Sequence, residues 1–287
     1  MFDREDTIPL SEDVFRLLRD IIREYCGLYF DDDSRYLVEK RLSRRVRMRH
    51  LDNFRDYYRF ILYDRNSRDE LTEIMDVLTV NETYFFREQN QLRAFSEEIL
   101  EELKEKNKAK RTLRIWSAGC STGEEPYTIA MLINEKESFA GWDIEIHGSD
   151  INQRVLQVAR RGIYRKNSFR TTEFYYKSRY FVEEEEGAYK ISDSIKKLVT
   201  FSYLNLLDPY KTRFLGKMDV ILCRNVLIYF DGVSRKKVID NFYDRLVDDG
   251  YLLLGHAESL MNISTAFALK HLRNDMVYRK PSEKRII

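Results

Sequence analysis

Residues 114–130, RIWSAGCSTGEEPYTIA, place a glycine turn between an apolar strand and a helix. Such turns often begin a nucleotide-type cofactor site, because the backbone N–H groups at a helix N-terminus bind anions. Here the turn ends in two adjacent carboxylates, Glu124 and Glu125, which repel a pyrophosphate and attract a cation. The dinucleotide pattern G-x-G-x-x-G does not fit either, since the glycines fall at 119 and 123. The same acids can also simply complement the helix dipole, so capping remains an alternative.

Two further strand ends carry side chains that suit a cofactor site. Asp150 ends one apolar run, and Arg224-Asn225 ends another. In open α/β sheets the ligand binds beyond the carboxyl ends of the strands, so these residues and the glycine turn are expected at one edge. A carboxylate at Asp150 can accept both hydroxyl hydrogens of a ribose. S-adenosylmethionine carries a sulfonium, an ammonium and a ribose but no phosphate, and therefore matches the whole set.

The elements that position these residues alternate along the second part of the chain. Strand-like runs such as TLRIWSAG, WDIEIHGSD and MDVILCRN are separated by helix-like runs such as GEEPYTIAMLINE and INQRVLQVARRG. This alternation predicts a parallel sheet with crossover helices. Near the C-terminus, FALKHLRNDMVYRK has strand character on both sides of Asn274-Asp275, which predicts an antiparallel hairpin.

The chain divides into three parts. We expect a helical N-terminal domain over residues 1–80, an interdomain segment that contributes to the cofactor site over 81–111, and an α/β domain over 112–287. Within the α/β domain, the aromatic-rich stretch from about 163 to 197 is too long for a simple crossover loop. We expect it to form a small inserted β-subdomain with a tight turn near Glu186-Gly187.

A basic helix is expected over residues 31–50, DDDSRYLVEKRLSRRVRMRH. Val38, Leu42 and Val46 mark its buried face, and Glu39 is the only acid among seven cations. These cations cannot neutralise one another, so the helix is either a solvated face or a docking surface for an acidic partner. Charge alone does not distinguish a nucleic acid from an acidic helical protein.

Composition excludes several classes of protein. The chain has 287 residues, 43% of them hydrophobic, and a net charge of +1, which allows a large core and gives no overall attraction to polyanions. The three cysteines and four histidines are scattered, which predicts reduced thiols and no metal site. The longest apolar runs fall far short of the ~20 residues that span a bilayer, and the N-terminus lacks a signal pattern. We therefore expect a cytoplasmic protein without membrane insertion.

Six segments, in order, resemble the motif series of one family. They are TVNETYFFRE at 79–88, WSAGCSTGEEPYTIAM at 116–131, GSDIN at 148–152, LNLL at 204–207, CRNVLIYF at 223–230 and GHAESL at 255–260. The series is similar to that of CheR, the chemotaxis receptor protein-glutamate O-methyltransferase. The resemblance implies an α/β fold with a Rossmann-like S-adenosylmethionine-dependent methyltransferase domain, whose sheet is mostly parallel with an antiparallel last strand. It also implies the inserted β-subdomain and the all-helical N-terminal domain.

The resemblance further implies an activity and a partner. The protein would methylate glutamate side chains on the cytoplasmic helical domain of chemoreceptors, the methyl-accepting chemotaxis proteins. The reaction would give methyl esters for sensory adaptation, with S-adenosylhomocysteine as the product of the cofactor. One alternative is a binding module that keeps the cofactor pocket but no longer transfers methyl groups. Another is nucleic-acid methylation, although the sequence has no Asn-Pro-Pro-Tyr run, and we expect no nucleic-acid partner.

The motifs imply a set of cofactor contacts. These are Asn81, Thr83, Arg87, Glu125, Asp150, Asn205, Leu206, Arg224 and Asn225. Asp150 would hold the ribose, and Asn205 and Asn225 would line the adenine and methionine region. In the glycine turn, either Glu124 or Glu125 can face the ligand, and the motif favours Glu125.

Two catalytic residues and a docking patch complete the expectations. Arg87 would steer the substrate carboxylate with its planar fork, and Tyr229 would orient that carboxylate or border the methyl group. The docking patch on the basic helix comprises Arg41, Arg44, Arg45 and Arg47. The turn VEEEEGAY is short and acidic and lacks the glycine-rich loop associated with a receptor C-terminal peptide, so we expect no peptide tether.

Overall fold

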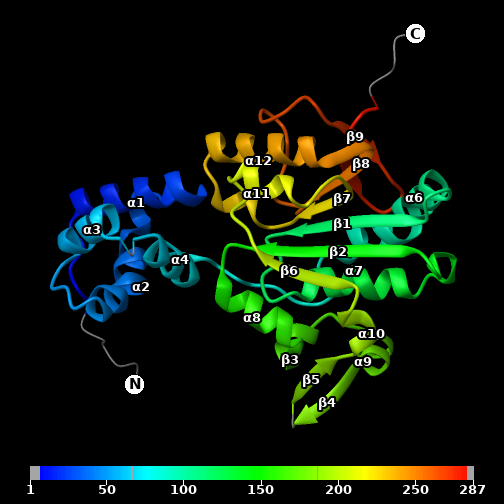
Figure 1. Ribbon diagram of the computed structural model, residues 1–287, viewed down its shortest axis with the longest axis horizontal. Helices are drawn as coiled ribbons and strands as arrows, with labels where there is room; N and C mark the ends of the chain where they lie inside the picture. The colour runs from blue at the N-terminus through cyan, green and yellow to red at the C-terminus, as the bar shows by residue number, and fades with distance from the viewer. Residues whose placement is uncertain (1–6, 66, 186, 283–287) are drawn as a thin grey trace.

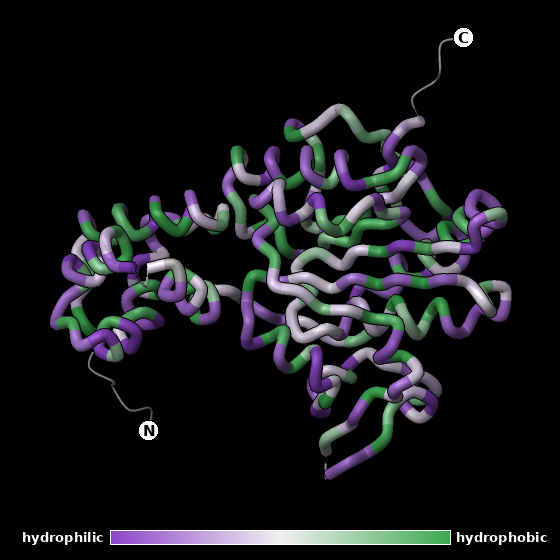
Figure 2. The backbone as a smooth tube through the Cα atoms, viewed as in Figure 1, coloured by the Kyte–Doolittle hydropathy of each residue, from purple (hydrophilic) through white to green (hydrophobic). Residues whose placement is uncertain are grey.

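The computed structural model describes residues 7–65, 67–185 and 187–282. A helical domain lies beside an α/β domain, at one end of its central sheet (Figure 1). The helical domain contains α1 (Glu12–Cys26), η1 (Asp32–Ser34), α2 (Arg35–Met48), α3 (Phe54–Tyr63) and α4 (Ser67–Leu78). Hydrophobic and hydrophilic residues are interspersed along these helices (Figure 2), and the hydrophobic ones form an apolar face on each helix that packs into the shared core. Gly27 ends α1 with a left-handed φ of 82°.

The central sheet has the strand order β6-β2-β1-β7-β8-β10-β9. Its strands are β1 (Thr112–Ala118), β2 (Asp143–Asp150), β6 (Val199–Tyr203), β7 (Met218–Cys223), β8 (Leu246–Leu254), β9 (Ala268–His271) and β10 (Met276–Arg279). β1 pairs in parallel with β2 and β7, and β10 pairs antiparallel with β8 and β9. The predicted fold class, a mostly parallel sheet with an antiparallel last strand, is confirmed, as is the terminal hairpin.

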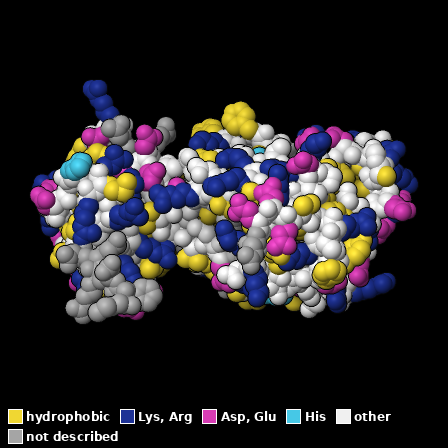
Figure 3. Space-filling model, turned by 90° about the horizontal axis from the view of Figure 1, so that it is seen from below, with side chains coloured by type: hydrophobic (Ala, Val, Ile, Leu, Met, Phe, Trp, Pro, Cys, Tyr) yellow, Lys and Arg dark blue, Asp and Glu magenta, His cyan; other side chains and the backbone are white. Residues whose placement is uncertain are grey.

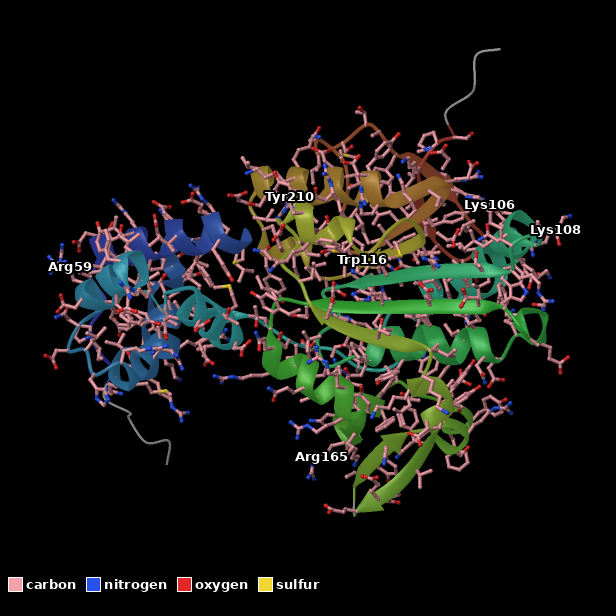
Figure 4. The ribbon with its side chains drawn as sticks, viewed as in Figure 1. Arg59, Lys106, Lys108, Trp116, Arg165 and Tyr210 are labelled. Carbon is pink, nitrogen blue, oxygen red and sulfur yellow. The ribbon has the colours of Figure 1, made fainter. Side chains whose placement is uncertain are left out.

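Helices cover both faces of this sheet (Figure 1). α7 (Glu124–Asn134) and α8 (Gln153–Arg161) lie on one face, and α11 (Pro209–Arg213) and α12 (Gly232–Arg245) lie on the other. Trp116 on β1 lies between the sheet and α12 (Figure 4), where its ring meets that of Phe242 edge to face at 5.2 Å. Outside residues 163–197 the chain also forms α5 (Gln89–Ala94), η2 (Phe95–Ile99), α6 (Leu100–Asn107), η3 (Glu137–Phe139) and η5 (Leu227–Tyr229).

The predicted inserted β-subdomain is confirmed. It contains β3 (Ile163–Arg165), η4 (Lys166–Phe169), α9 (Phe174–Tyr180), β4 (Phe181–Glu185), β5 (Ala188–Ile191) and α10 (Asp193–Lys196). Its three strands form an antiparallel sheet in the order β3-β5-β4. The turn expected at Glu186-Gly187 includes Glu186, which lies outside the described residues.

Contacts at several places join the helical domain to the α/β domain. The segment after α1 runs along η5, where Tyr29 N donates to Tyr229 O at 2.9 Å and Leu28 forms a β-bridge with Phe230. On the other side, Arg154 of α8 is paired with Glu73 of α4 at 2.8 Å. These contacts position the helical domain over the carboxyl ends of the strands.

Candidate active site

A cavity of about 270 Å³ lies between the two domains. The α/β domain contributes residues that follow β1, β2, β6 and β7, and the helical domain contributes the segment after α1 and the end of α4. All nine predicted cofactor contacts and Tyr229 line this one cavity. Residues that are far apart in the sequence therefore meet at the edge of the sheet where a ligand of an α/β domain is expected.

The glycine turn fits closely against the neighbouring strand end. Gly119 has a φ of 78°, and a Cβ on it would lie 2.4 Å from Cγ2 of Val226. The N–H groups of Gly119 and Cys120 both donate to Ser149 O, at 2.8 and 2.9 Å. A side chain at position 119 would be strained and would clash, so the turn requires glycine there.

The two adjacent acids of the turn have different environments. Glu124 is 2% exposed and accepts hydrogen bonds from Thr122 Oγ1 at 2.6 Å and Ser168 Oγ at 2.9 Å. Burial raises the pKa of its carboxyl. Glu125 lines the cavity and accepts from Ser117 Oγ at 2.7 Å. Of the two alternatives left open by the sequence, the geometry brings Glu125 to the cavity.

Asp150 at the end of β2 is held by two backbone N–H groups. Ser121 N donates to its Oδ2 at 2.8 Å, and Asn152 N donates to its Oδ1 at 2.9 Å. Burial raises the pKa of Asp150 to about 6. Because a carboxylate has about four acceptor positions, these two bonds leave capacity for the hydroxyl groups of a ligand.

Arg224 connects three parts of the site through bonds within the protein. Its guanidinium donates to Glu88 at 3.0 Å, to Glu125 at 3.1 Å and to the carbonyl of Arg87 at 2.5 Å. Its side chain is 2% exposed, so these contacts are almost shielded from water. Arg224 thereby joins the Arg87 segment to the glycine turn.

The two predicted amide side chains differ in how they are bonded. Asn205 Nδ2 donates to Tyr25 O at 2.5 Å, while its Oδ1 accepts from Leu207 N at 3.0 Å, so its amide joins the two domains. Asn225 has a φ of 59°, and its Oδ1 is buried without a hydrogen-bond partner in the described part of the chain. Leu206 is buried beside them.

The two predicted catalytic residues line the cavity from different elements. Arg87 lies in the segment between α4 and α5, and its Nη1 donates to Glu82 O at 2.9 Å. Tyr229 lies in η5 after β7. Asn81 and Thr83 line the cavity from the same segment as Arg87, and Asn81 O accepts from Ser121 Oγ at 3.1 Å.

The predicted docking patch loses one of its four members. Arg45 is 6% exposed, and its guanidinium is paired with Glu70 at 2.8 Å and Glu73 at 3.0 Å. The prediction that Arg45 is available for docking is therefore wrong, because carboxylates of α4 neutralise it inside the domain. Arg44 and Arg47 are exposed, and Arg41 is half-buried with Nη1 donating to Leu78 O.

Sequence reasoning missed two groups of residues at the site. The first is the segment after α1, where Leu28, Tyr29 and Phe30 line the cavity without side chains typical of a polar site. The second is Glu258, whose carboxylate accepts from the N–H groups of Asn225 at 2.8 Å and Gly255 at 2.7 Å, among others. Glu258 lies in the GHAESL segment, so a signal for it was present in the motif.

The residues of the cavity fit S-adenosylmethionine. Asp150 can accept the ribose hydroxyls, Glu125 supplies negative charge for a cationic ligand, and Asn225 Oδ1 is an acceptor without a partner among the described residues. Leu206 and Val226 add apolar surface.

No described helix combines the length and apolar composition that crossing a membrane requires.

Comparison with known proteins supports the same assignment. The family model for the SAM binding domain of the CheR methyltransferases matches residues 81–276, and the model for their all-alpha domain matches residues 13–79. Chemotaxis protein methyltransferase 2 of Vibrio cholerae is 38% identical over 96% of this chain and 95% of its own length. The chemotaxis protein methyltransferase of Borreliella burgdorferi is 36% identical over 88% of this chain and 90% of its own length. The chain therefore belongs to the CheR family of methyltransferases, with S-adenosylmethionine as its cofactor.

Proposed function

We propose that the protein methylates glutamate side chains on the cytoplasmic helical domain of chemoreceptors, giving glutamate methyl esters for sensory adaptation. The observation that carries this proposal is a single cavity that brings four residues together. Asp150 and Glu125 are the acids expected to hold the cofactor, and Arg87 and Tyr229 are the groups expected to meet the substrate carboxylate. The relatives named chemotaxis protein methyltransferase support it, because they match both domains over most of their length. The site of action is then the cytoplasm.

The chemistry asks little of the protein beyond positioning. A glutamate carboxylate has an unperturbed pKa of about 4.3, so it is an ionised nucleophile at neutral pH and needs no general base. S-adenosylmethionine supplies the methyl group and a neutral thioether as the leaving group. The protein therefore has to align the carboxylate with the methyl carbon and exclude water from the cavity. A pocket closed by a second domain suits both tasks.

Arg87 and Tyr229 are the proposed carboxylate-positioning groups. One nitrogen of Arg87 donates to Glu82 O, which leaves other donors of the guanidinium for a substrate oxygen. Tyr229 makes no side-chain hydrogen bond within the described residues, so its hydroxyl is available to a substrate. Methylation removes the negative charge of the carboxylate, so the attraction to Arg87 falls and the ester is released more readily.

The surface supports docking of an acidic helical partner. Arg44 and Arg47 are exposed on α2, and Arg41 lies beside the segment that enters the cavity. Lys and Arg side chains also appear on the α/β domain when the molecule is viewed from the side of α8 (Figure 3). On the inserted subdomain, β4 carries Glu183 and Glu185 as exposed residues, so a peptide bound there would meet negative charge. We propose docking through α2 without a peptide tether.

Methyl transfer from radiolabelled S-adenosylmethionine to receptor cytoplasmic fragments tests the proposal. The expected result is base-labile label on the receptor fragment. Replacing the methylated glutamates of the fragment by alanine should abolish that label. Asp150→Ala provides an enzyme control that should bind the cofactor weakly and give little label. Label that resists base, or that appears only in RNA or in a small metabolite, would overturn the substrate assignment.

A further inference from the structure

Arg87 occupies a strained turn. Phe86 before it has a φ of 59°, and Glu88 after it has a φ of 57°. Non-glycine residues rarely adopt this left-handed region, and they do so only where the surrounding structure enforces it. The presentation of Arg87 at the cavity therefore depends on the groups that hold both sides of the turn.

The side after Arg87 is held by the α/β domain. Glu88 accepts hydrogen bonds from Arg224 at 3.0 Å, and Arg224 also donates to the carbonyl of Arg87. Burial alone would raise the pKa of Glu88, but the charge of Arg224 lowers it below its usual value. The carboxylate is thus fixed in its ionised form.

The side before Arg87 is held by the inserted β-subdomain. Phe85 is fully buried, and its ring packs against Tyr164, Phe169 and Phe181 of the subdomain at 4.8, 5.3 and 5.0 Å. The polar backbone of Phe85 is bonded to the same subdomain. Its N–H donates to Ser168 O at 2.9 Å, and its carbonyl accepts from Thr171 Oγ1 at 2.9 Å.

Arg170 adds a second connection from the subdomain to the Arg87 segment. Its Nη2 donates to Glu82 Oε1 at 2.6 Å, and its guanidinium lies 3.7 Å from the centre of the Tyr84 ring. Arg87 uses the same two residues, because its Nη1 donates to Glu82 O and its guanidinium lies 5.6 Å from the Tyr84 ring. Glu82 and Tyr84 thus link Arg170 with Arg87.

We propose that Arg170 and Thr171 are positioning residues for methyl transfer. They hold the turn around Arg87 from the inserted subdomain, so the subdomain is a structural support of the active site. The inference rests on the proposed function, in which Arg87 meets the substrate carboxylate. It also implies that a change in residues 168–171, at the end of η4 and directly after it, is transmitted to the active site.

The test compares Thr171→Val and Arg170→Gln with the unchanged enzyme. Thr171→Val keeps the shape of the side chain but removes the donor to Phe85 O, and Thr171→Ser restores that donor. We expect kcat on receptor fragments to fall about tenfold for Thr171→Val and for Arg170→Gln, because small misplacements of a positioning group have large effects on rate. Affinity for S-adenosylhomocysteine should fall by less than about threefold, and Thr171→Ser should recover most of kcat.

A matched control and a second readout keep the test decisive. Lys166→Gln removes an exposed cation of the same subdomain that has no ion pair within the described residues, and it should leave kcat unchanged. Hydrogen exchange of the amides in residues 83–89 should be faster in Thr171→Val and unchanged in Lys166→Gln. The exchange measurement needs no receptor and therefore tests the support of the turn by itself. If the unchanged enzyme fails to methylate receptors, that result overturns the proposed function but leaves the exchange result standing. Unchanged kcat in both variants, or unchanged exchange in Thr171→Val, would overturn the positioning role.

Discussion

Arg224 Nη1 lies 3.1 Å from Glu125 Oε2, so the acid of the cofactor turn already has a cationic partner within the protein. The same guanidinium binds Glu88, and two carboxylates with one guanidinium leave a single negative charge in this group. That remaining charge still favours a cationic ligand over a phosphate. The interpretation of the acidic turn stays a prediction, in which Glu125 shares its charge with Arg224.

Removal of Arg224 is expected to destabilise the fold strongly. Arg224→Ala leaves the mostly buried carboxylates of Glu88 and Glu125 without their shared cation, and the free energy of unfolding should fall by about 3–5 kcal/mol. Urea denaturation followed by circular dichroism measures this change. Arg114→Ala is the control, because Arg114 pairs with Glu145 on the surface and should cost about 0–1 kcal/mol. Similar losses in the two variants would contradict the assignment of a buried link.

Cofactor affinity is expected to depend on the protonation of Asp150. Because burial raises its pKa to about 6, the carboxylate of the ligand-free protein gains a proton as the pH falls through that value. A protonated carboxyl is a poorer acceptor for ribose hydroxyls, so S-adenosylhomocysteine should bind up to about tenfold more weakly for each pH unit below 6. Calorimetry between pH 5 and 8 measures this slope. Asp150→Ala should bind weakly without the slope, and an equal slope in the variant would assign it to another group.

The same residue gives a pH dependence of stability with a defined sign. The pKa of Asp150 in the folded protein lies above its ordinary value of 3.8, so the native state binds more protons between the two values. The contribution of Asp150 to the free energy of unfolding therefore falls as the pH rises from about 4 to 6, by about 3 kcal/mol. Asp150→Ala should remove this part of the profile when urea denaturation is repeated across that range.

Much of the fold was predictable because its signals are local. The alternation of strand and helix patterns after residue 112, the glycine turn and the terminal hairpin each depend on short stretches of sequence. The choice between Glu124 and Glu125 was not local. Glu124 is removed from the cavity by a hydrogen bond from Ser168, which lies 44 positions further along the chain in the inserted subdomain. No periodicity of the turn reveals that partner.

The error at Arg45 had a partial signal in the sequence. Arg45 and Val46 lie three and four positions after Leu42, so both share its side of the helix, and Leu42 and Val46 are fully buried. The compensating acids, Glu70 and Glu73, belong to α4. The packing of α4 against α2 is tertiary structure, which the local sequence pattern does not give. A cation on the apolar side of a helix predicts a buried partner, but the sequence alone does not identify that partner.

Two adjacent arginines of α2 are expected to differ sharply in their effect on stability. Glu70 is fully buried and accepts from Arg45, Tyr57 and Arg49. Burial would raise its pKa, but these hydrogen bonds lower it below 4.5. Arg45→Ala should therefore reduce the free energy of unfolding by about 3–5 kcal/mol at pH 7, and the loss should shrink in acid as Glu70 of the variant gains a proton. Exposed Arg44→Ala should change it by less than about 0.5 kcal/mol in the same urea titrations.

Charge reversal at Arg44 and Arg47 is expected to affect receptor recognition alone. Both side chains are exposed on α2, and the described residues provide no ion pair for either, so their charge is available to an acidic partner. The variant with Arg44→Glu and Arg47→Glu should raise KM for receptor fragments by about tenfold at low salt, with a smaller effect at high salt because exposed charges are screened. Steady-state methylation measures KM, and calorimetry should give unchanged affinity for S-adenosylhomocysteine.

The control for this docking surface is Arg59→Glu on α3. Arg59 is exposed in the same domain (Figure 4), and its ion pair within the described residues is a surface one with Asp56. Arg59→Glu changes the net charge by the same amount per residue as the reversals on α2. At about 0.15 M salt its KM should match that of the unchanged enzyme within about twofold, since exposed charges further from the partner than the Debye length of about 8 Å are largely screened. An equal rise in KM for Arg59→Glu would indicate a general charge effect. A loss of cofactor affinity in the α2 variant would indicate misfolding, and either result would remove the docking role from Arg44 and Arg47.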